Sequence, residues 1–208
     1  MVWGDLQTAF LLIIASAVFD FFDGLTARAL KVSSPIGKEL DSLADVITFG
    51  FAPAAMVYSW ISECAAVNLG MPIAAIVPFF AFLMAAFSAL RLAKFNVDER
   101  QTSSFIGLPT PANALFWGAL VIGSHDGIVA HPYGWLLVIA LVLLFSWLLV
   151  AELPMFSLKF KNLTWKSNRT VYIFLLVSLV LLILLGLNGL SAVIGWYIVL
   201  SVLTQKKG

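Results

Sequence analysis

The sequence predicts an all-α integral membrane protein, a polytopic bundle of about seven transmembrane helices in a single domain over residues 1–208. Of its 208 residues, 62% are hydrophobic and only 11% are charged, and the mean hydropathy is +1.01. This composition excludes a soluble globule whose charged surface surrounds one apolar core. The second observation is a series of apolar runs near the length that crosses a bilayer, roughly 17 to 25 residues.

The apolar runs define the predicted spans in order along the chain. They lie at about residues 6–22, 46–62, 71–90, 110–124, 134–151, 171–186 and 189–204, and the fourth is the shortest. The last two form one apolar stretch that is too long for a single span. Gly186, Asn188 and Gly189 predict a tight turn that divides it into two helices.

Charge distribution gives the orientation of these spans, because Lys and Arg of short loops stay on the cytoplasmic side. All twelve basic residues follow the odd-numbered runs: Arg28, Lys31, Lys38, Arg91, Lys94, Arg100, Lys159, Lys161, Lys166, Arg169, Lys206 and Lys207. The net charge of +1 is explained by this topology, and no nucleic-acid partner is expected. Seven spans with a cytoplasmic C-terminus place the N-terminus outside. Met1–Gln7 holds neither a signal peptide nor an anchor, so we expect an eighth helix upstream.

Four aspartates, Asp20, Asp23, Asp41 and Asp45, carry the chemistry of the chain. An ionised carboxylate at membrane depth costs about 2.5 to 3.5 kcal/mol on insertion scales, so the cluster needs a compensating partner. Residues three or four apart share a helical face, which groups the aspartates into two pairs. Gly24, Pro35 and Gly37 favour a turn between the pairs, which would bring all four carboxylates together on the cytoplasmic side.

Hard, oxygen-seeking divalent cations are the simplest partner for such a cluster, and the absence of His and Cys nearby in the sequence argues against zinc. Two metal ions can clamp the attacking and leaving oxygens of a displacement at phosphorus, with one carboxylate left as a base. Gly24, Ala27 and Gly37 would let a ligand approach the backbone closely. Helix packing is the competing explanation for these small residues.

The spacing Asp20-x2-Asp23-Gly24-x2-Ala27-Arg28-x8-Gly37-x3-Asp41-x3-Asp45 resembles the signature of the CDP-alcohol phosphotransferases at every fixed position. The resemblance implies a CDP-linked donor, attack by an alcohol and loss of CMP. It also implies two divalent cations, Mg²⁺ or Mn²⁺, held by the four aspartates, with Asp45 as the general base. The nucleotide would be bound by Gly24, Ala27, Arg28 and Gly37.

Two further segments, residues 41–54 and 91–113, look like the phosphatidylserine synthase branch of that family in bacteria and archaea. This resemblance implies CDP-diacylglycerol and L-serine as substrates, a homodimer, and a place in the inner (cytoplasmic) membrane with the active site facing the cytoplasm. Arg91, Lys94, Arg100 and Thr102 are candidate substrate contacts, while anchoring by positive charge is the alternative for the basic ones. Two rival functions remain: the same reaction with glycerol 3-phosphate, inositol phosphate or choline, and a divalent-cation transporter.

Overall fold

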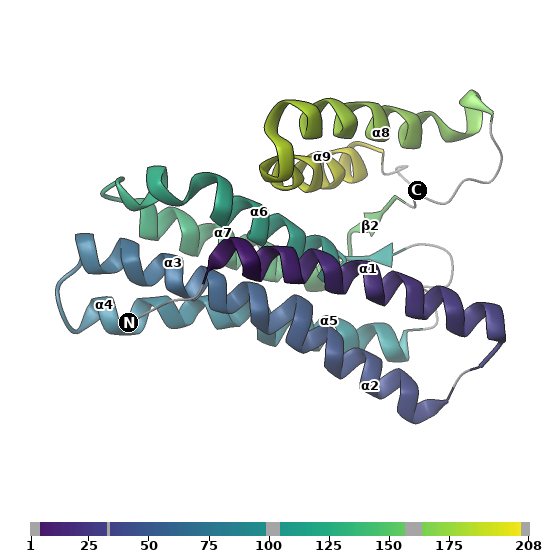
Figure 1. The fold of residues 1–208 in the computed structure, drawn as a ribbon, viewed down its shortest axis with the longest axis horizontal. Helices are drawn as coiled ribbons and strands as arrows, with labels where there is room; N and C mark the ends of the chain where they lie inside the picture. Colours follow the sequence, from purple (N-terminus) through teal and green to yellow (C-terminus); the bar gives the residue numbers. More distant parts are fainter. Residues whose placement is uncertain (1–4, 33, 99–104, 157–163, 205–208) are drawn as a thin grey trace.

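The structure is a computed structural model that describes residues 5–32, 34–98, 105–156 and 164–204. Long helices lie alongside one another in a bundle, and the only strands in the described part are two residues each (Figure 1). The predicted all-α class is therefore confirmed. The elements in chain order are α1 (Leu6–Leu30), α2 (Pro35–Asp45), the π-helix η1 (Val46–Phe51), α3 (Ala52–Asn68), α4 (Ile73–Ile76), the 3₁₀ helix η2 (Val77–Phe82), α5 (Leu83–Val97), β1 (Phe105–Ile106), α6 (Thr110–Val129), α7 (Gly134–Val150), β2 (Pro154–Met155), α8 (Trp165–Leu185), the 3₁₀ helix η4 (Gly186–Asn188) and α9 (Gly189–Leu203).

Local sequence explains why α1 and α2 form an antiparallel pair. Helix α1 ends at Lys31, which adopts a left-handed conformation with φ 54°. Helix α2 begins after Ser34, whose Oγ accepts a hydrogen bond of 3.1 Å from the Gly37 N–H, and Pro35 occupies the first helical position. Capping by Ser and Pro at the first position are both strong helix-start signals. The predicted turn is thus real but shorter than expected, because Gly24 lies inside α1 and Gly37 inside α2.

Four helical stretches are long and apolar enough to cross a membrane: Leu6–Leu30, Pro35–Asn68, Ile73–Val97 and Asn168–Leu203. Helix also occupies each of the seven predicted ranges, including a shorter apolar helix at Gly134–Val150. The predicted division of the last stretch is present, since Gly186 has φ 59° and separates α8 from α9. Because only four stretches in the described residues meet the criteria of a span, the count of seven transmembrane helices is not confirmed.

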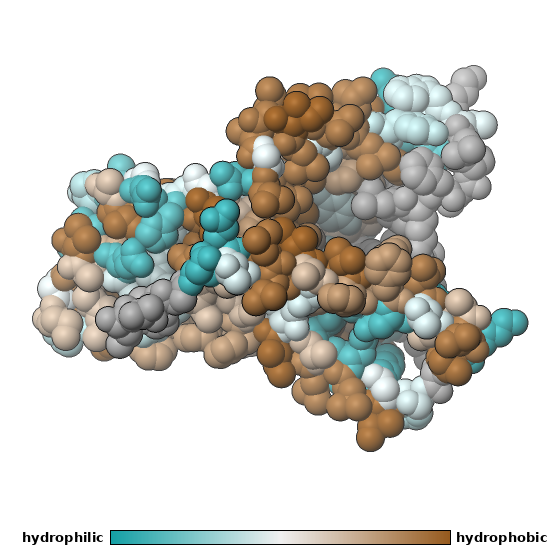
Figure 2. Space-filling model, in the orientation of Figure 1, coloured by the Kyte–Doolittle hydropathy of each residue, from teal (hydrophilic) through white to brown (hydrophobic). Residues whose placement is uncertain are grey.

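Apolar side chains cover much of the outer surface of these helices. Phe19, Ile183 and Leu184 are each more than two thirds exposed. Figure 2 shows hydrophobic residues across the middle of the molecule and hydrophilic residues gathered toward its ends. Monomeric soluble proteins rarely expose apolar area on this scale, whereas a bilayer covers it. The surface therefore fits a protein embedded in a membrane.

Glycine lets α1 pack closely against α6. A Cβ added to Gly118 on α6 would lie 2.1 Å from Cδ2 of Phe10 on α1, and the Phe10 ring is 1% exposed. The buried ring has no free space into which it can move, because protein interiors are close-packed. Gly118 is therefore required by packing at this crossing.

We expect Gly118→Ala to lower the stability of the purified protein by about 1 to 3 kcal/mol, the usual cost of overpacking a core. The matched control is Gly127→Ala on the same helix, where an added Cβ meets nothing within 4 Å. The control should be neutral or slightly stabilising, since Ala favours helix more than Gly. Thermal unfolding in detergent measures both variants, and equal melting temperatures would contradict this account of the crossing.

Candidate active site

Three of the four aspartates meet where α1 and α2 lie beside each other. Asp20, Asp23 and Asp41 each offer a carboxylate oxygen, and these oxygens all lie within 4.8 Å of one another. Asp20 is partly buried, while Asp23 and Asp41 are exposed. The sequence predicts that all four carboxylates come together, and the structure brings Asp41 to Asp20 and Asp23, whereas Asp45 lies outside this group.

A bound cation would relieve the electrostatic repulsion within this cluster. Two unit charges 4 Å apart interact by about 4 kcal/mol at an effective dielectric of 20, so three ionised carboxylates at this distance repel one another strongly. Carboxylate oxygens are the ligands that Mg²⁺, Mn²⁺ and Ca²⁺ prefer. The donor set therefore fits a divalent cation, although binding itself stays a prediction.

Asp45 ends α2, directly before the π-helix η1. It is partly buried and stands outside the group of three carboxylates. Its electrostatic neighbours are Asp20, Asp41, Arg91 and Asp23. Single-turn π-helices are rare and often mark functional sites. The position puts the Asp45 carboxylate within electrostatic range of the cluster and of Arg91 on α5.

Polar contacts hold α2 against α5 at this end of the bundle. Lys38 Nζ donates a hydrogen bond of 3.0 Å to the carbonyl oxygen of Asn96, and Asn96 Nδ2 donates one of 2.9 Å to Ser42 Oγ. Farther along, a Cβ added to Gly50 would lie 3.0 Å from Cβ of Ser88 on α5. These two hydrogen bonds hold α2, which carries Asp41 and Asp45, in place against α5.

The small residues of the motif differ in their surroundings. A Cβ added to Gly24 would meet only the Arg28 guanidinium, at 3.7 and 3.9 Å, which is ordinary contact. Gly24 is therefore not a packing contact in the described structure, and the Arg28 head group lies close to it. At Gly37 an added Cβ would lie 2.9 Å from the capping Ser34 Oγ, so this glycine has a structural role. Ala27 is partly buried, and its carbonyl oxygen accepts from the Lys31 N–H at the end of α1.

Of the candidate substrate contacts, the structure describes Arg91 and Lys94. Arg91 is 7% exposed, donates a hydrogen bond of 3.4 Å to Thr110 Oγ1 and lies 5.6 Å from the centre of the Phe95 ring. Its buried Nε has no hydrogen-bond partner within the described ranges. Lys94 follows one turn later and is exposed. Arg100 and Thr102 lie outside the described residues.

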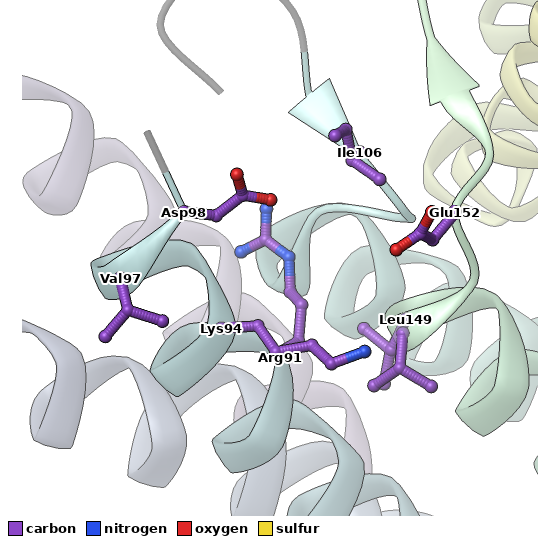
Figure 3. A pocket seen from close by; sticks show the side chains of 8 residues that line it. Arg91, Lys94, Val97, Asp98, Ile106, Leu149 and Glu152 are labelled. Atoms are coloured by element: carbon purple, nitrogen blue, oxygen red, sulfur yellow. The ribbon is translucent and has the colours of Figure 1, made fainter. Parts of the chain in front are cut away.

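A pocket of about 320 Å³ opens around Arg91 and Lys94 (Figure 3). It is lined by Arg91, Lys94, Val97, Asp98, Ile106, Leu149, Val150 and Glu152. The two acidic residues, Asp98 and Glu152, are not among the site residues expected from the sequence. One signal was present for Glu152, because it is the last acidic residue of the chain and directly follows an apolar run.

The described part of the chain thus combines apolar helices, a cluster of three carboxylates whose oxygens suit a divalent cation, and a pocket lined by basic and acidic side chains. The family model described as CDP-alcohol phosphatidyltransferase matches residues 2–152. The chain belongs to this family, which confirms the resemblance seen in the aspartate motif.

Several relatives are named CDP-diacylglycerol–serine O-phosphatidyltransferase. The relative from Helicobacter pylori is 31% identical over 194 residues, 92% of this chain and 77% of its own length. The relative from Bacillus subtilis is 37% identical over 115 residues, 53% of this chain and 58% of its own length. The relative from Methanocaldococcus jannaschii is 39% identical over 110 residues, 53% of this chain and 48% of its own length. The chain is thus similar to proteins of that name from both bacteria and archaea.

Proposed function

We propose that this chain transfers a phosphatidyl group from CDP-diacylglycerol to the hydroxyl group of L-serine. Phosphatidylserine would remain in the bilayer and CMP would leave. The observation that carries the proposal is the meeting of Asp20, Asp23 and Asp41 within 4.8 Å in a chain of this family. The names of the relatives support the choice of serine.

The residues of the chain have distinct parts in the proposed reaction. Asp20, Asp23 and Asp41, with Asp45 as the expected fourth ligand, would hold two divalent cations, Mg²⁺ or Mn²⁺. When bound, these cations would neutralise the diphosphate and the charge that develops during displacement. Arg28 near Gly24 would lie beside the nucleotide.

Asp45 would act as general base and take the proton of the serine hydroxyl. The serine oxygen would form a bond to the phosphorus that carries diacylglycerol. The bond from that phosphorus to the bridging oxygen would break, and the bridging oxygen would leave as part of CMP. The proton would end on the Asp45 carboxylate, from which it passes to water.

The arrangement in the cell is part of the same proposal. The chain would be one domain with about seven spans in the inner membrane. The aspartates would face the cytoplasm, because the end of α1, the start of α2 and the end of α5, which carry Arg28, Lys38 and Lys94, lie on the same side of the molecule (Figure 1). The enzyme would act as a homodimer. Soluble serine and CMP would then exchange with the cytoplasm while donor and product keep their acyl chains in the membrane.

Release of CMP by the purified protein in liposomes tests the function. The reaction would contain CDP-diacylglycerol and Mn²⁺, with serine, glycerol 3-phosphate, inositol phosphate, choline or no acceptor. We expect release that depends on serine. Release only with another acceptor would keep the chemistry and replace the substrate, whereas metal flux into liposomes without any CMP would favour a transporter.

The variant Gly24→Ala tests whether Gly24 contacts the nucleotide or only packs within the protein. Because the added methyl group fits the described structure, the melting temperature should stay the same or rise, as Ala favours helix over Gly by about 1 kcal/mol. The KM for CDP-diacylglycerol should rise by about 10-fold if the nucleotide approaches this backbone closely, since one lost contact of 1.4 kcal/mol gives that factor. An unchanged KM would remove Gly24 from the nucleotide site.

A further inference from the structure

Among the described residues that line the pocket around Arg91 and Lys94, two are basic and two are acidic. Arg91 and Lys94 supply two positive charges, and Asp98 and Glu152 supply two negative charges. Figure 3 shows Arg91 and Asp98 on one side of the pocket and Glu152 on the opposite side, with its carboxylate directed into the space between them. We propose that this pocket binds the acceptor as an amino-acid zwitterion, with Glu152 as the specificity-determining residue that receives its ammonium group. The inference rests on the function proposed above and names the residues that select the acceptor.

The size and the charge of the pocket both favour a small zwitterion. A volume of about 320 Å³ lies at the lower end of the range for ligand sites, about 300 to 1,000 Å³. A phosphorylated acceptor would bring two negative charges close to Asp98 and Glu152, and like charges at contact distance repel. An acceptor with one carboxylate and one ammonium group can pair with both signs at once.

Arg91 provides a hydrogen-bond donor for the acceptor carboxylate. Buried polar atoms are nearly always hydrogen-bonded, so an orphaned donor calls for a ligand or a water. The Nε of Arg91 is buried and without a partner in the described part of the chain, while its Nη1 is occupied by Thr110 Oγ1. Lys94, one turn along α5, adds a second cation on the same face of the helix.

The backbone around Glu152 is held by contacts with the segment before α6. Strand β1 pairs with β2, with Ile106 opposite Pro154. The Gly107 N–H donates to the carbonyl oxygen of Leu153 at 2.9 Å, and Leu108 N–H donates to that of Leu148 at the same distance. Gly107 has φ 78°, and an added Cβ would lie 2.6 Å from the Leu149 carbonyl oxygen, so the close approach requires glycine. These backbone contacts therefore hold the segment that carries Glu152 in a defined position.

One residue that lines the pocket, Arg91, also interacts electrostatically with the expected base. Arg91 is an electrostatic neighbour of Asp45, and α5 packs against η1, which follows Asp45 directly. A serine held by its carboxylate at Arg91 and by its ammonium at Glu152 would keep its hydroxyl on the Asp45 side. The residue that binds the serine carboxylate, Arg91, and the expected base, Asp45, would then lie on the same side of the bound serine.

The test uses two acceptors that each lack one charge of serine. Ethanolamine keeps the hydroxyl and the ammonium group, whereas 3-hydroxypropionate keeps the hydroxyl and the carboxylate. Rates of CMP release would be measured for the full chain in liposomes with each acceptor. In Glu152→Gln we expect the KM for serine to rise by about 10-fold or more, the usual effect of losing a charged hydrogen bond. The KM for 3-hydroxypropionate and that for CDP-diacylglycerol should change by less than about twofold, because neither depends on the lost pair.

Lys94→Gln removes a positive charge that would pair with the acceptor carboxylate. In this variant the KM for serine should rise, while the KM for ethanolamine, which has no carboxylate, should stay unchanged. Glu152→Asp, which keeps the charge, should retain the preference of the wild type for serine over 3-hydroxypropionate. The matched control is Glu63→Gln. Glu63 lies near the C-terminal end of α3 and does not line the pocket, and its Oε2 is 3.2 Å from Nε2 of His125. All acceptors should behave as in the wild type in this control.

Two results would overturn the inference. If the wild type depends on serine but Glu152→Gln leaves the KM for serine unchanged, or raises that for serine and 3-hydroxypropionate equally, Glu152 does not bind the ammonium group. The proposed function would then stand. If CMP release by the wild type does not depend on serine, the proposed function falls together with the zwitterion site.

Discussion

Asp45→Asn should lower serine-dependent CMP release by about 100-fold or more, within the range of 10² to 10⁴ typical of a general base. Asparagine keeps the shape of the side chain but cannot accept the proton of the acceptor hydroxyl. The fold should persist, because Asp45 makes no ion pair with Arg91 within 4 Å in the described structure and the change leaves the helix N-terminal and C-terminal to it intact. Initial rates with saturating serine, CDP-diacylglycerol and Mn²⁺ measure the effect.

Two controls make this result specific to Asp45. Asp126→Asn applies the same substitution beside His125, away from the cluster, and should retain the wild-type rate. The concentration of Mn²⁺ that gives half-maximal rate should also be measured in Asp45→Asn. A rate within about twofold of the wild type would exclude Asp45 as the base, since loss of a base costs far more. A rate restored by excess Mn²⁺ would show that Asp45 acts as a metal ligand instead.

Removal of the divalent cation should abolish the activity, and Asp41→Asn should raise the Mn²⁺ concentration for half-maximal rate by about 10-fold or more, since affinity depends on the number of charged ligands. The same variant has an opposite effect on the metal-free protein. Three carboxylates within 4.8 Å repel one another, so removal of one charge should leave the melting temperature unchanged or raise it.

Thermal unfolding with and without Mn²⁺ distinguishes these effects. The wild type should be stabilised by Mn²⁺, by about 2.7 kcal/mol at a concentration 100 times the dissociation constant. Asp41→Asn should lose most of that stabilisation, while Glu39→Gln, an exposed acidic residue on the same helix, should keep it. A melting temperature of the wild type that does not respond to Mn²⁺, Mg²⁺ or Ca²⁺ would contradict a metal site at this cluster.

The sequence predicts the helices and the aspartate cluster because both depend on local periodicity. Apolar runs identify the helices, and spacings of three and four residues identify the shared faces. Helix ends are less predictable, since α1 continues to Leu30 beyond the apolar run that ends near residue 22. Asp23 ends the run but not the helix, because the backbone hydrogen bonds continue to the cap at Lys31.

Other features of the site depend on tertiary contacts that leave no local pattern. The π-helix at Val46–Phe51 follows from a shift of backbone hydrogen bonds, and its sequence, Val-Ile-Thr-Phe-Gly-Phe, has no pattern that distinguishes it from the α-helices on either side. Glu152 lines the same pocket as Arg91, and the pairing of β1 with β2 and the close approach of Gly107 to the end of α7 hold its segment there. The resemblance to the family identified Arg91 but could not indicate that a residue so distant in the chain lines the same pocket.

Incorporation of labelled L-serine into extractable lipid is the most direct test of the central claim. Purified protein in liposomes would receive CDP-diacylglycerol and Mn²⁺, and both labelled lipid and CMP would be counted. We predict labelled phosphatidylserine in a one-to-one ratio with CMP, lost on chelation of the metal and in Asp45→Asn. CMP without labelled lipid, or labelled lipid that persists in Asp45→Asn and after chelation, would contradict the account.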